Sequence, residues 1–357
     1  MTHTFCGQYK LIMLLLICLS AVAHAQKKLN ICIAGLSHKG VAEVINQYKN
    51  GRVNILGIAE SDKDLQKKYQ AQFHLADTLF YTDLQKMLTV KEPDVVMAYN
   101  EVSKHLDVVK TCAPLGILVM VEKPLTATLD QAQQMEMLVE KYHNRILTNY
   151  ETTWYPSYQE VYNAINLDSI GGIKKIVVNA GQTEVKEGGN GNTTTSSLIT
   201  ALPGGSTALN DFGSYGADIM TWFMRGLKPV AITVLTHHTK QETTSGDANI
   251  ILEYPGVTGL IKTSWNIPDH NLEILGQNGY LHAFNNQVVL LSKNGKQTTL
   301  QTEPIRAPLN DQLSYITAVL QNKISNDDRS SLRYNVIVME ILEAAKRSVK
   351  ENKRIAL

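Results

Sequence analysis

Between residues 29 and 151, short apolar runs alternate with amphipathic segments, and no other feature restricts the fold as much. Runs such as LNICIAGL (29–36) and VNILGIAE (53–60) are almost continuously apolar, which is typical of strands buried on both faces. Segments between them, such as VAEVINQYKN (41–50), have helical spacing. We therefore expect a doubly wound parallel sheet of the Rossmann type, covered by helices on both faces and complete near residue 150.

The remaining elements of this first domain follow the same alternation. The further strands are expected at 93–100, 117–124 and 145–151, and the further helices at 61–73, 81–90, 103–116 and 129–144. The first domain is therefore expected to span residues 27–150.

The second half of the chain, residues 151–357, has a different pattern. After a helix at about 156–166, strand-like runs follow one another with tight turns between them, which predicts an α+β domain with a large, mostly antiparallel sheet. These runs are 173–181, 230–238, 248–254, 257–265, 271–277, 280–285 and 287–292. Two helices, at about 309–321 and 331–350, close the chain. The Gly/Thr/Ser/Asn-rich stretch 186–206 is either a loop without fixed structure or a flap over a site.

Residues 1–25 have the features of a secretory signal peptide. Lys10 precedes the apolar run LIMLLLICLSAVA, and Ala23-His24-Ala25 has the small-x-small pattern of a cleavage site. The run is shorter than the roughly 20 residues that span a membrane comfortably, so an uncleaved anchor is the weaker alternative. We expect export, to the periplasm, with no membrane attachment after cleavage.

The charge and cysteine content exclude some classes of partner. The net charge of +1 includes Lys10, so the rest of the chain is formally neutral and gives no indication of nucleic acid as a partner. Cys32 and Cys112 fall in an expected strand and an expected helix, where we predict isolated core thiols rather than a disulfide. No Cys/His spacing is typical of a metal site, so no metal is expected.

A glycine-containing turn joins the first strand to the first helix. It reads Gly35-Leu36-Ser37-His38-Lys39-Gly40, at the position where a helix N-terminus binds a dinucleotide pyrophosphate. Ser37 stands where the usual motif has its middle glycine, so an ordinary tight turn is the alternative. Glu60 ends the second strand 25 residues after Gly35, where an acid accepts hydrogen bonds from ribose hydroxyls and repels the extra phosphate of NADP. Together these features predict NAD rather than NADP.

Two further segments carry candidate catalytic groups. In LNDFGSYGADIMTWFMRG (209–226), helical spacing places Asp211, Tyr215 and Asp218 on one face. Alternatively, Asp211 only caps the helix and Tyr215 only packs in the core. The apolar run GILVMVEKPL (116–125) ends in Glu122-Lys123-Pro124, at the carboxyl end of a parallel strand, which is where ligands bind in such sheets. Alternatively, the charged residues Glu122 and Lys123 only form salt bridges that cap the end of the strand.

From about residue 29 to its end, the chain resembles the family of glucose–fructose oxidoreductase and inositol dehydrogenase (Gfo/Idh/MocA). The resemblance is carried by the order and spacing of several short motifs. They are the Gly35 turn, Glu60, Ala98-Tyr99-Asn100 followed by His105, Glu122-Lys123-Pro124, Asp211-x-Gly213-x-Tyr215-x-x-Asp218, Trp265-x-x-Pro268 and Gly276-Gln277-Asn278-Gly279.

This resemblance implies roles for individual residues. Lys123 is expected to reach the substrate hydroxyl beside the nicotinamide, with Pro124 after a cis peptide bond, and Asp211 and Tyr215 are expected to face the substrate. Tyrosine in place of the family's more frequent histidine raises the intrinsic pKa from about 6.5 to about 10, so Lys123 would have to lower it. The remaining expected contacts are Gly35, Ser37, His38, Gly40, Glu60, Asn100, His105 and Glu122 to the cofactor, and Trp154, Asp218 and Trp265 to the substrate.

The function expected from these features is an exported oxidoreductase. It would transfer a hydride between a sugar or glycoside hydroxyl and a tightly bound NAD, because free NAD is not expected outside the cytoplasm. A redox-assisted glycoside hydrolase or lyase without net redox change, and a sugar-binding protein on a dehydrogenase fold, are the alternatives. The resemblance also implies a homo-oligomer, either a dimer or a tetramer.

Overall fold

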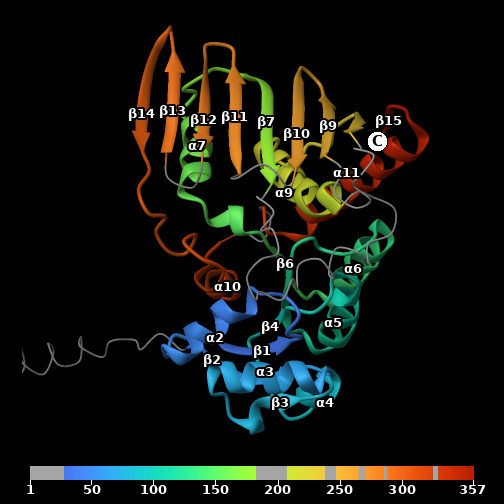
Figure 1. Ribbon diagram of the computed structural model, residues 1–357. Coiled ribbons are helices and arrows are strands. Elements are labelled where there is room, and N and C mark those ends of the chain that lie inside the picture. Colours follow the sequence, from blue (N-terminus) through green and yellow to red (C-terminus); the bar gives the residue numbers. More distant parts are fainter. Residues whose placement is uncertain (1–27, 182–206, 238–246, 265–269, 285–287, 325–328) are drawn as a thin grey trace, which may run out of the picture.

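The structure is a computed structural model that describes residues 28–181, 207–237, 247–264, 270–284, 288–324 and 329–357. The expected signal peptide, the 186–206 stretch and Trp265 therefore lie outside the described residues. Figure 1 shows two sheets, one built from the first half of the chain and one from the second.

The first sheet has six parallel strands in the order β3-β2-β1-β4-β5-β6. The strands are β1 (Asn30–Ala34), β2 (Asn54–Ala59), β3 (Phe80–Tyr81), β4 (Val95–Ala98), β5 (Leu118–Glu122) and β6 (Ile146–Asn149). Strands β4 and β5 are buried along their whole length, as apolar strands covered on both faces must be. The order reverses between β1 and β4, so the carboxyl ends of these strands open onto a crevice. The expected doubly wound sheet is confirmed.

Helices cover both faces of this sheet because alternate side chains of each strand point to opposite faces. Cys32, Val96 and Val119 pack against α5 and α6, whereas Ile31 and Val95 pack against α2, α3 and the late helix α10. The helices and short 3-10 turns of this part are α2 (Val41–Lys49), α3 (Lys63–Phe73), η1 (Asp77–Leu79), α4 (Leu84–Leu88), η2 (Val102–Lys104), α5 (His105–Cys112), η3 (Ala113–Leu115), α6 (Leu129–Tyr142) and α10 (Gln312–Leu320). The C-terminal part of the chain therefore returns to complete the core of the first domain.

The second sheet has nine strands in the order β14-β13-β12-β11-β7-β10-β9-β8-β15. Only the β7–β10 pair among them is parallel, so the expected mostly antiparallel sheet is confirmed. The strands are β7 (Ile173–Gly181), β8 (Ala231–His237), β9 (Asp247–Tyr254), β10 (Val257–Ser264), β11 (Asn271–Gly276), β12 (Gly279–Phe284), β13 (Val288–Lys293), β14 (Lys296–Gln301) and β15 (Ile355–Ala356).

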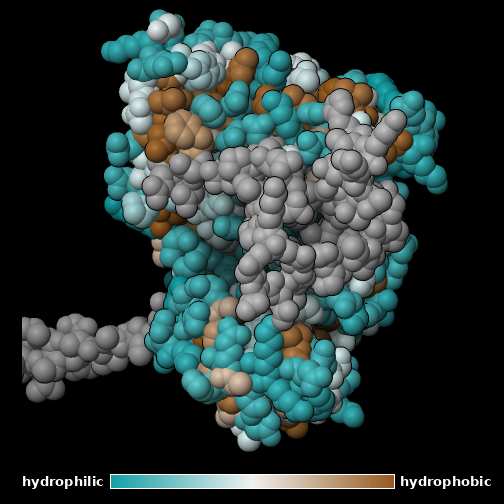
Figure 2. All heavy atoms as spheres, in the orientation of Figure 1, coloured by the Kyte–Doolittle hydropathy of each residue, from teal (hydrophilic) through white to brown (hydrophobic). Residues whose placement is uncertain are grey.

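One face of the second sheet is covered by helices and the other is partly open. Helices α7 (Pro156–Asn166), α9 (Thr207–Phe223) and α11 (Leu332–Glu351) pack on the covered face, and α11 also contacts α6 and β6. On the other face, alternate residues of β9 and β11 stay half exposed, and Figure 2 shows hydrophobic residues among hydrophilic ones over this sheet. None of the helices in the described residues is long and apolar enough to span a membrane.

The structure differs from the sequence expectation in strands β14 and β15, in the helix expected at 103–116, which is divided into η2, α5 and η3, and around α4. Strand β14 was not expected, because its sequence KQTTLQ is polar and the strand is mostly exposed at the edge of the sheet. The helix expected at 81–90 is only the short α4, and the chain before it forms β3 instead. Cys32 and Cys112 are buried free thiols, as predicted.

Helix α9 approaches the second sheet closely through a glycine. A Cβ built at Gly216 would lie 2.2 Å from Cγ2 of Ile261, a fully buried residue of β10. At Gly213, one turn earlier, a Cβ would lie no closer than 3.4 Å to any neighbour, which is ordinary van der Waals contact. The two glycines of this helix therefore have different roles: close packing at Gly216 and no steric requirement at Gly213.

We expect Gly216→Ala to lower the free energy of unfolding by about 1–3 kcal/mol, because the methyl group overpacks the interface with Ile261. Gly213→Ala is the matched control, and we expect it to be neutral or to stabilise by up to about 1 kcal/mol, since alanine favours the helix. Urea unfolding followed by circular dichroism measures both. Equal effects of the two substitutions would contradict the close packing at Gly216.

Candidate active site

A cavity of about 500 Å³ lies at the carboxyl ends of strands β5 and β6, beside the first turns of α9. Residues from both domains line it, because the Gly35 turn, β5 and η4 (Glu151–Trp154) meet α9 there. The lining residues are His38, Lys39, Gly40, Glu43, Val102, Glu122, Lys123, Pro124, Asn149, Glu151, Trp154, Asn210, Asp211, Phe212, Tyr215, His270, Asp311 and Gln312.

Lys123 and Asp211 form an ion pair across this cavity. The Lys123 ammonium donates a hydrogen bond to the Asp211 carboxylate, and both side chains are largely buried. The Lys123 Nζ also lies 4.5 Å from the centroid of the Tyr215 ring, which is a cation–π contact. The Lys123-Pro124 peptide bond is cis, as the resemblance implied. The structure therefore brings together the three residues predicted to be catalytic.

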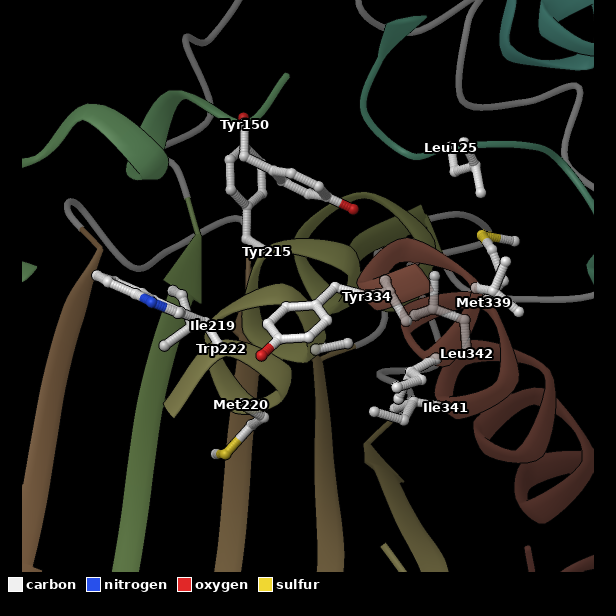
Figure 3. Close-up of a cluster of buried hydrophobic side chains, with 14 of the residues drawn as sticks. Leu125, Tyr150, Tyr215, Ile219, Met220, Trp222, Tyr334, Met339, Ile341 and Leu342 are labelled. Carbon is white, nitrogen blue, oxygen red and sulfur yellow. The ribbon is translucent and has the colours of Figure 1, made fainter. Parts of the chain in front are cut away.

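The Tyr215 ring is enclosed by aromatic neighbours. It packs edge-on against Tyr150, with 5.6 Å between ring centroids, and its centroid lies 4.7 Å from that of His270. Figure 3 shows Tyr150 and Tyr215 together at one end of the hydrophobic cluster between α9 and α11. Burial, and then the Asp211 carboxylate, raise the pKa of Tyr215 well above its ordinary value. The expectation that Lys123 lowers this pKa stays a prediction: in the structure Asp211 holds the ammonium over the ring face, and burial is the largest cause of the raised pKa.

Glu122 is held by its neighbour on the adjacent strand. It pairs with Asn149 in the parallel register of β5 and β6, and the Asn149 amide donates a 2.8 Å hydrogen bond to its carboxylate. Asn149 in turn accepts a 3.0 Å hydrogen bond from the Trp154 indole. Burial raises the pKa of Glu122 to about 7, against the opposing effect of the Asn149 hydrogen bond and Lys123. Glu122 is therefore close to half protonated at neutral pH.

His38 connects the Gly35 turn to this carboxylate. Its Nδ1 accepts a 3.1 Å hydrogen bond from the Gly40 N–H and lies 3.9 Å from the Glu122 carboxylate. Burial, and then Lys123, lower the pKa of His38 to about 4. His38 is therefore neutral at neutral pH and adds no charge to the cavity.

A second cavity, of about 210 Å³, lies on the other side of the Gly35 turn. Gly35 has a φ of +85° there, and a Cβ at this position would lie 2.4 Å from Cβ of Asn100, so only glycine fits. Both oxygens of Glu60 accept backbone hydrogen bonds, from Leu36 at 2.8 Å and from Asp62 at 2.9 Å. Ser37 lines this cavity with Gly35, Glu60 and Asn100. The side-chain oxygen of Asn100 is buried and has no hydrogen-bond partner among the described residues.

Two predicted contacts are wrong. His105 is fully buried, lines neither cavity, and has its Nδ1 3.1 Å from the carbonyl oxygen of Leu125, so it holds the chain after Pro124 rather than a ligand. Asp218 is 3% exposed and lies two turns beyond Asp211 in α9, outside the lining of the cavity. Burial, and then the Asp218 carboxylate, raise the pKa of Tyr150. Trp154 lines the cavity as predicted, and Trp265 lies outside the described residues.

Several lining residues were missed by the sequence reasoning. Asn210 directly precedes Asp211, and Asn149 and Glu151 lie shortly before Trp154. The sequence therefore placed them near predicted site residues, but it did not show that they line the cavity. His270 lies two residues after Pro268 of the Trp265 motif, so its neighbourhood was also known, whereas Gln312 carried no signal because it comes from a segment far from the motifs in sequence. Among the described residues, no group of His, Cys, Asp and Glu side chains is arranged to hold a metal ion.

Comparisons with known proteins agree with this geometry. Residues 29–150 match the model of an oxidoreductase family with an NAD-binding Rossmann fold, and residues 158–282 match the GFO/IDH/MocA C-terminal domain. A trans-1,2-dihydrobenzene-1,2-diol dehydrogenase of Xenopus laevis is 27% identical over 264 residues, which cover 71% of this chain and 75% of that protein.

Solved structures share the fold over nearly the whole chain. An aldose–aldose oxidoreductase from Caulobacter crescentus, complexed with glycerol, has a TM-score of 0.77 at 17% identity and covers 93% of this chain and 100% of its own. An inositol dehydrogenase homolog from Azotobacter vinelandii, complexed with NADH and myo-inositol, has a TM-score of 0.76 at 13% identity, covering 93% and 98%. The two domain matches together span most of this chain, which therefore belongs to the Gfo/Idh/MocA family of oxidoreductases.

Proposed function

We propose that the protein transfers a hydride between NAD and a carbinol carbon of a sugar or related polyol. The observation that carries this proposal is the convergence of Lys123, Asp211 and Tyr215 in a cavity that adjoins the Gly35 turn. The named activities of the relatives, which act on a dihydrodiol, on aldoses and on inositol, support a vicinal diol or polyol as the substrate.

The residues of the second cavity fit a dinucleotide. Gly35 lets the turn pack closely against Asn100, and the buried side-chain oxygen of Asn100 is an acceptor that has no partner among the described residues. The Glu60 carboxylate, fixed by two backbone N–H groups, is placed to accept ribose hydroxyls and to repel a 2′-phosphate. We therefore assign NAD rather than NADP. When bound, the nicotinamide supplies the hydride acceptor or donor.

The side chains of the first cavity position the substrate oxygen and move its proton. Lys123 donates a hydrogen bond to that oxygen, and Asp211 holds the ammonium in place. Tyr215, which burial keeps protonated, donates the proton to the oxygen when a ketone is reduced. By microscopic reversibility, the Tyr215 phenolate accepts the hydroxyl proton when the carbinol is oxidised.

We also propose that the protein is exported and retains its cofactor through successive turnovers, on the basis of the residue 1–25 segment and the dinucleotide cavity. Self-association as a dimer or tetramer stays a prediction from the resemblance. We expect the purified protein to release NAD on denaturation, detected by mass spectrometry of the filtrate. A filtrate without dinucleotide, from protein that also fails to bind added NAD, would count against the proposal.

Replacing Lys123 by methionine tests the catalytic assignment. We expect Lys123→Met to lower kcat by at least about 100-fold, because the ammonium that holds the reacting oxygen is lost. Bound NAD should be retained, since the Gly35 turn and Glu60 are untouched. Lys228→Met, on the surface, removes an ion pair with Glu340 and is the control for a lost lysine. Turnover by the Lys123 variant at the wild-type rate would contradict the site, and release of aglycone without net NADH would identify the redox-assisted hydrolase instead.

The raised pKa of Tyr215 predicts the pH dependence of oxidation. Below that pKa the phenolate fraction rises tenfold per pH unit, so kcat/KM for carbinol oxidation should keep rising through pH 9 without a plateau. Tyr215→Phe should lose this slope, whereas Tyr150→Phe, which alters only the ring beside it, should keep it. Initial rates between about pH 6 and pH 10 measure the profile. A plateau reached near neutral pH would show that Lys123 does lower the phenol pKa.

A further inference from the structure

Asn210 presents an unused hydrogen-bond donor at the wall of the first cavity. It precedes Asp211 in the first turn of α9, and it is 3% exposed. Its amide Nδ2 is buried and has no hydrogen-bond partner among the described residues. A buried amide donor is strongly favoured to find an acceptor, so a ligand oxygen beside Lys123 is its natural partner.

Glu151 places a negative charge at the same wall. It opens the η4 turn, lines the cavity, and accepts a 3.2 Å hydrogen bond from the Tyr155 hydroxyl. The Glu151 side chain is exposed, and its charge adds, after burial, to the rise in the pKa of Tyr215 and of Glu122. The two residues that follow it in the turn, Thr152 and Thr153, are buried and uncharged.

The charges that line the cavity leave no cation to balance Glu151 among the described residues. The lining carboxylates are Glu43, Glu122, Glu151, Asp211 and Asp311, and the lining lysines are Lys39 and Lys123. Lys123 is already paired with Asp211, and Asp311 is paired with Arg52 at 2.7 Å. Lys39 is exposed and belongs to the Gly35 turn, on the cofactor side. Glu43 also lies on the cofactor side, in the first turn of α2, so the described residues of the substrate side leave the Glu151 charge unbalanced.

We propose that Glu151 and Asn210 set the substrate class of this site: a neutral or amine-bearing polyhydroxyl compound is accepted, and one that carries a carboxylate or phosphate is rejected. The Asn210 amide donates to a hydroxyl or carbonyl oxygen of the substrate near the reacting one. Glu151 repels an anionic substituent, which finds no free cation among the described residues of the substrate side, and it attracts an ammonium group. This inference rests on the proposed function, because it concerns the substrate of the same site.

The test compares three compounds with one ring and different charges: glucose, glucuronate and glucosamine. Dissociation constants are measured by calorimetry on the NAD-bound protein at about pH 6, where the amine is protonated and the carboxylate ionised. We expect glucosamine to bind at least as tightly as glucose, and glucuronate to bind about tenfold more weakly or worse. Glucuronate binding as tight as glucose, or no binding of any of the three, overturns the inference.

Two substitutions assign the effect to residues. Glu151→Gln should narrow the glucose-to-glucuronate ratio several-fold, and Glu151→Lys should reverse it. Glu43→Gln removes a carboxylate from the α2 side of the same cavity and should leave the ratio unchanged. If Glu43→Gln changed the glucose-to-glucuronate ratio by the same factor as Glu151→Gln, the proposed role of Glu151 would be overturned.

Asn210→Ala should weaken the binding of glucose and glucosamine by a similar factor, about 3- to 10-fold, without changing their ratio. Unchanged affinities would overturn the proposed Asn210 hydrogen bond. Turnover of the same compounds is recorded in parallel as NADH formation. If binding depended on charge as expected but no compound were turned over, the proposed oxidoreductase function would be refuted and the inferred ligand preference would stand. The experiment therefore distinguishes failure of the proposed function from failure of this inference.

Discussion

The ion pair between Lys123 and Asp211 joins the end of strand β5 to the first turn of α9, and the site depends on it. A largely buried charge is costly unless it is paired, so neither residue is stable in this position without the other. The pair therefore fixes where the second domain meets the carboxyl edge of the first sheet. It also fixes the position of an ammonium group that lines the cavity and has further hydrogen-bond donors besides the one that Asp211 accepts.

The same burial that makes the pair necessary controls the other ionisable groups. It raises the pKa of Tyr215 and Glu122 and lowers that of His38, so each of the three is shifted toward its neutral form. A protonated phenol beside a paired ammonium is suited to donate a proton to a carbonyl oxygen. In the proposed reaction, the protonated phenol therefore serves ketone reduction, and carbinol oxidation depends on the small phenolate fraction.

Much of the fold followed from the sequence, because buried parallel strands and amphipathic helices have distinct periods. The meeting of Lys123 with Asp211 was predicted because one lies at the end of a parallel strand and the other in a helix with a recognisable motif. His105 and Asp218 were assigned wrongly, because a motif position does not tell whether a side chain points to a cavity or into the core. Strand β14 was missed because an exposed edge strand has no buried face to give it a pattern.

The residues proposed to perform the chemistry and those proposed to choose the substrate are close neighbours along the chain. Asn210 precedes Asp211, and Glu151 follows the Tyr150 that packs on Tyr215. Helix α9 fixes the backbone of Asn210 as it fixes that of Asp211, and Glu151 opens η4, but neither side chain takes part in the ion pair. Such an arrangement lets the charge and hydrogen-bonding of the substrate wall vary without moving Lys123. A common catalytic geometry can then serve polyols of different charge, since only the wall beside the reacting oxygen has to change.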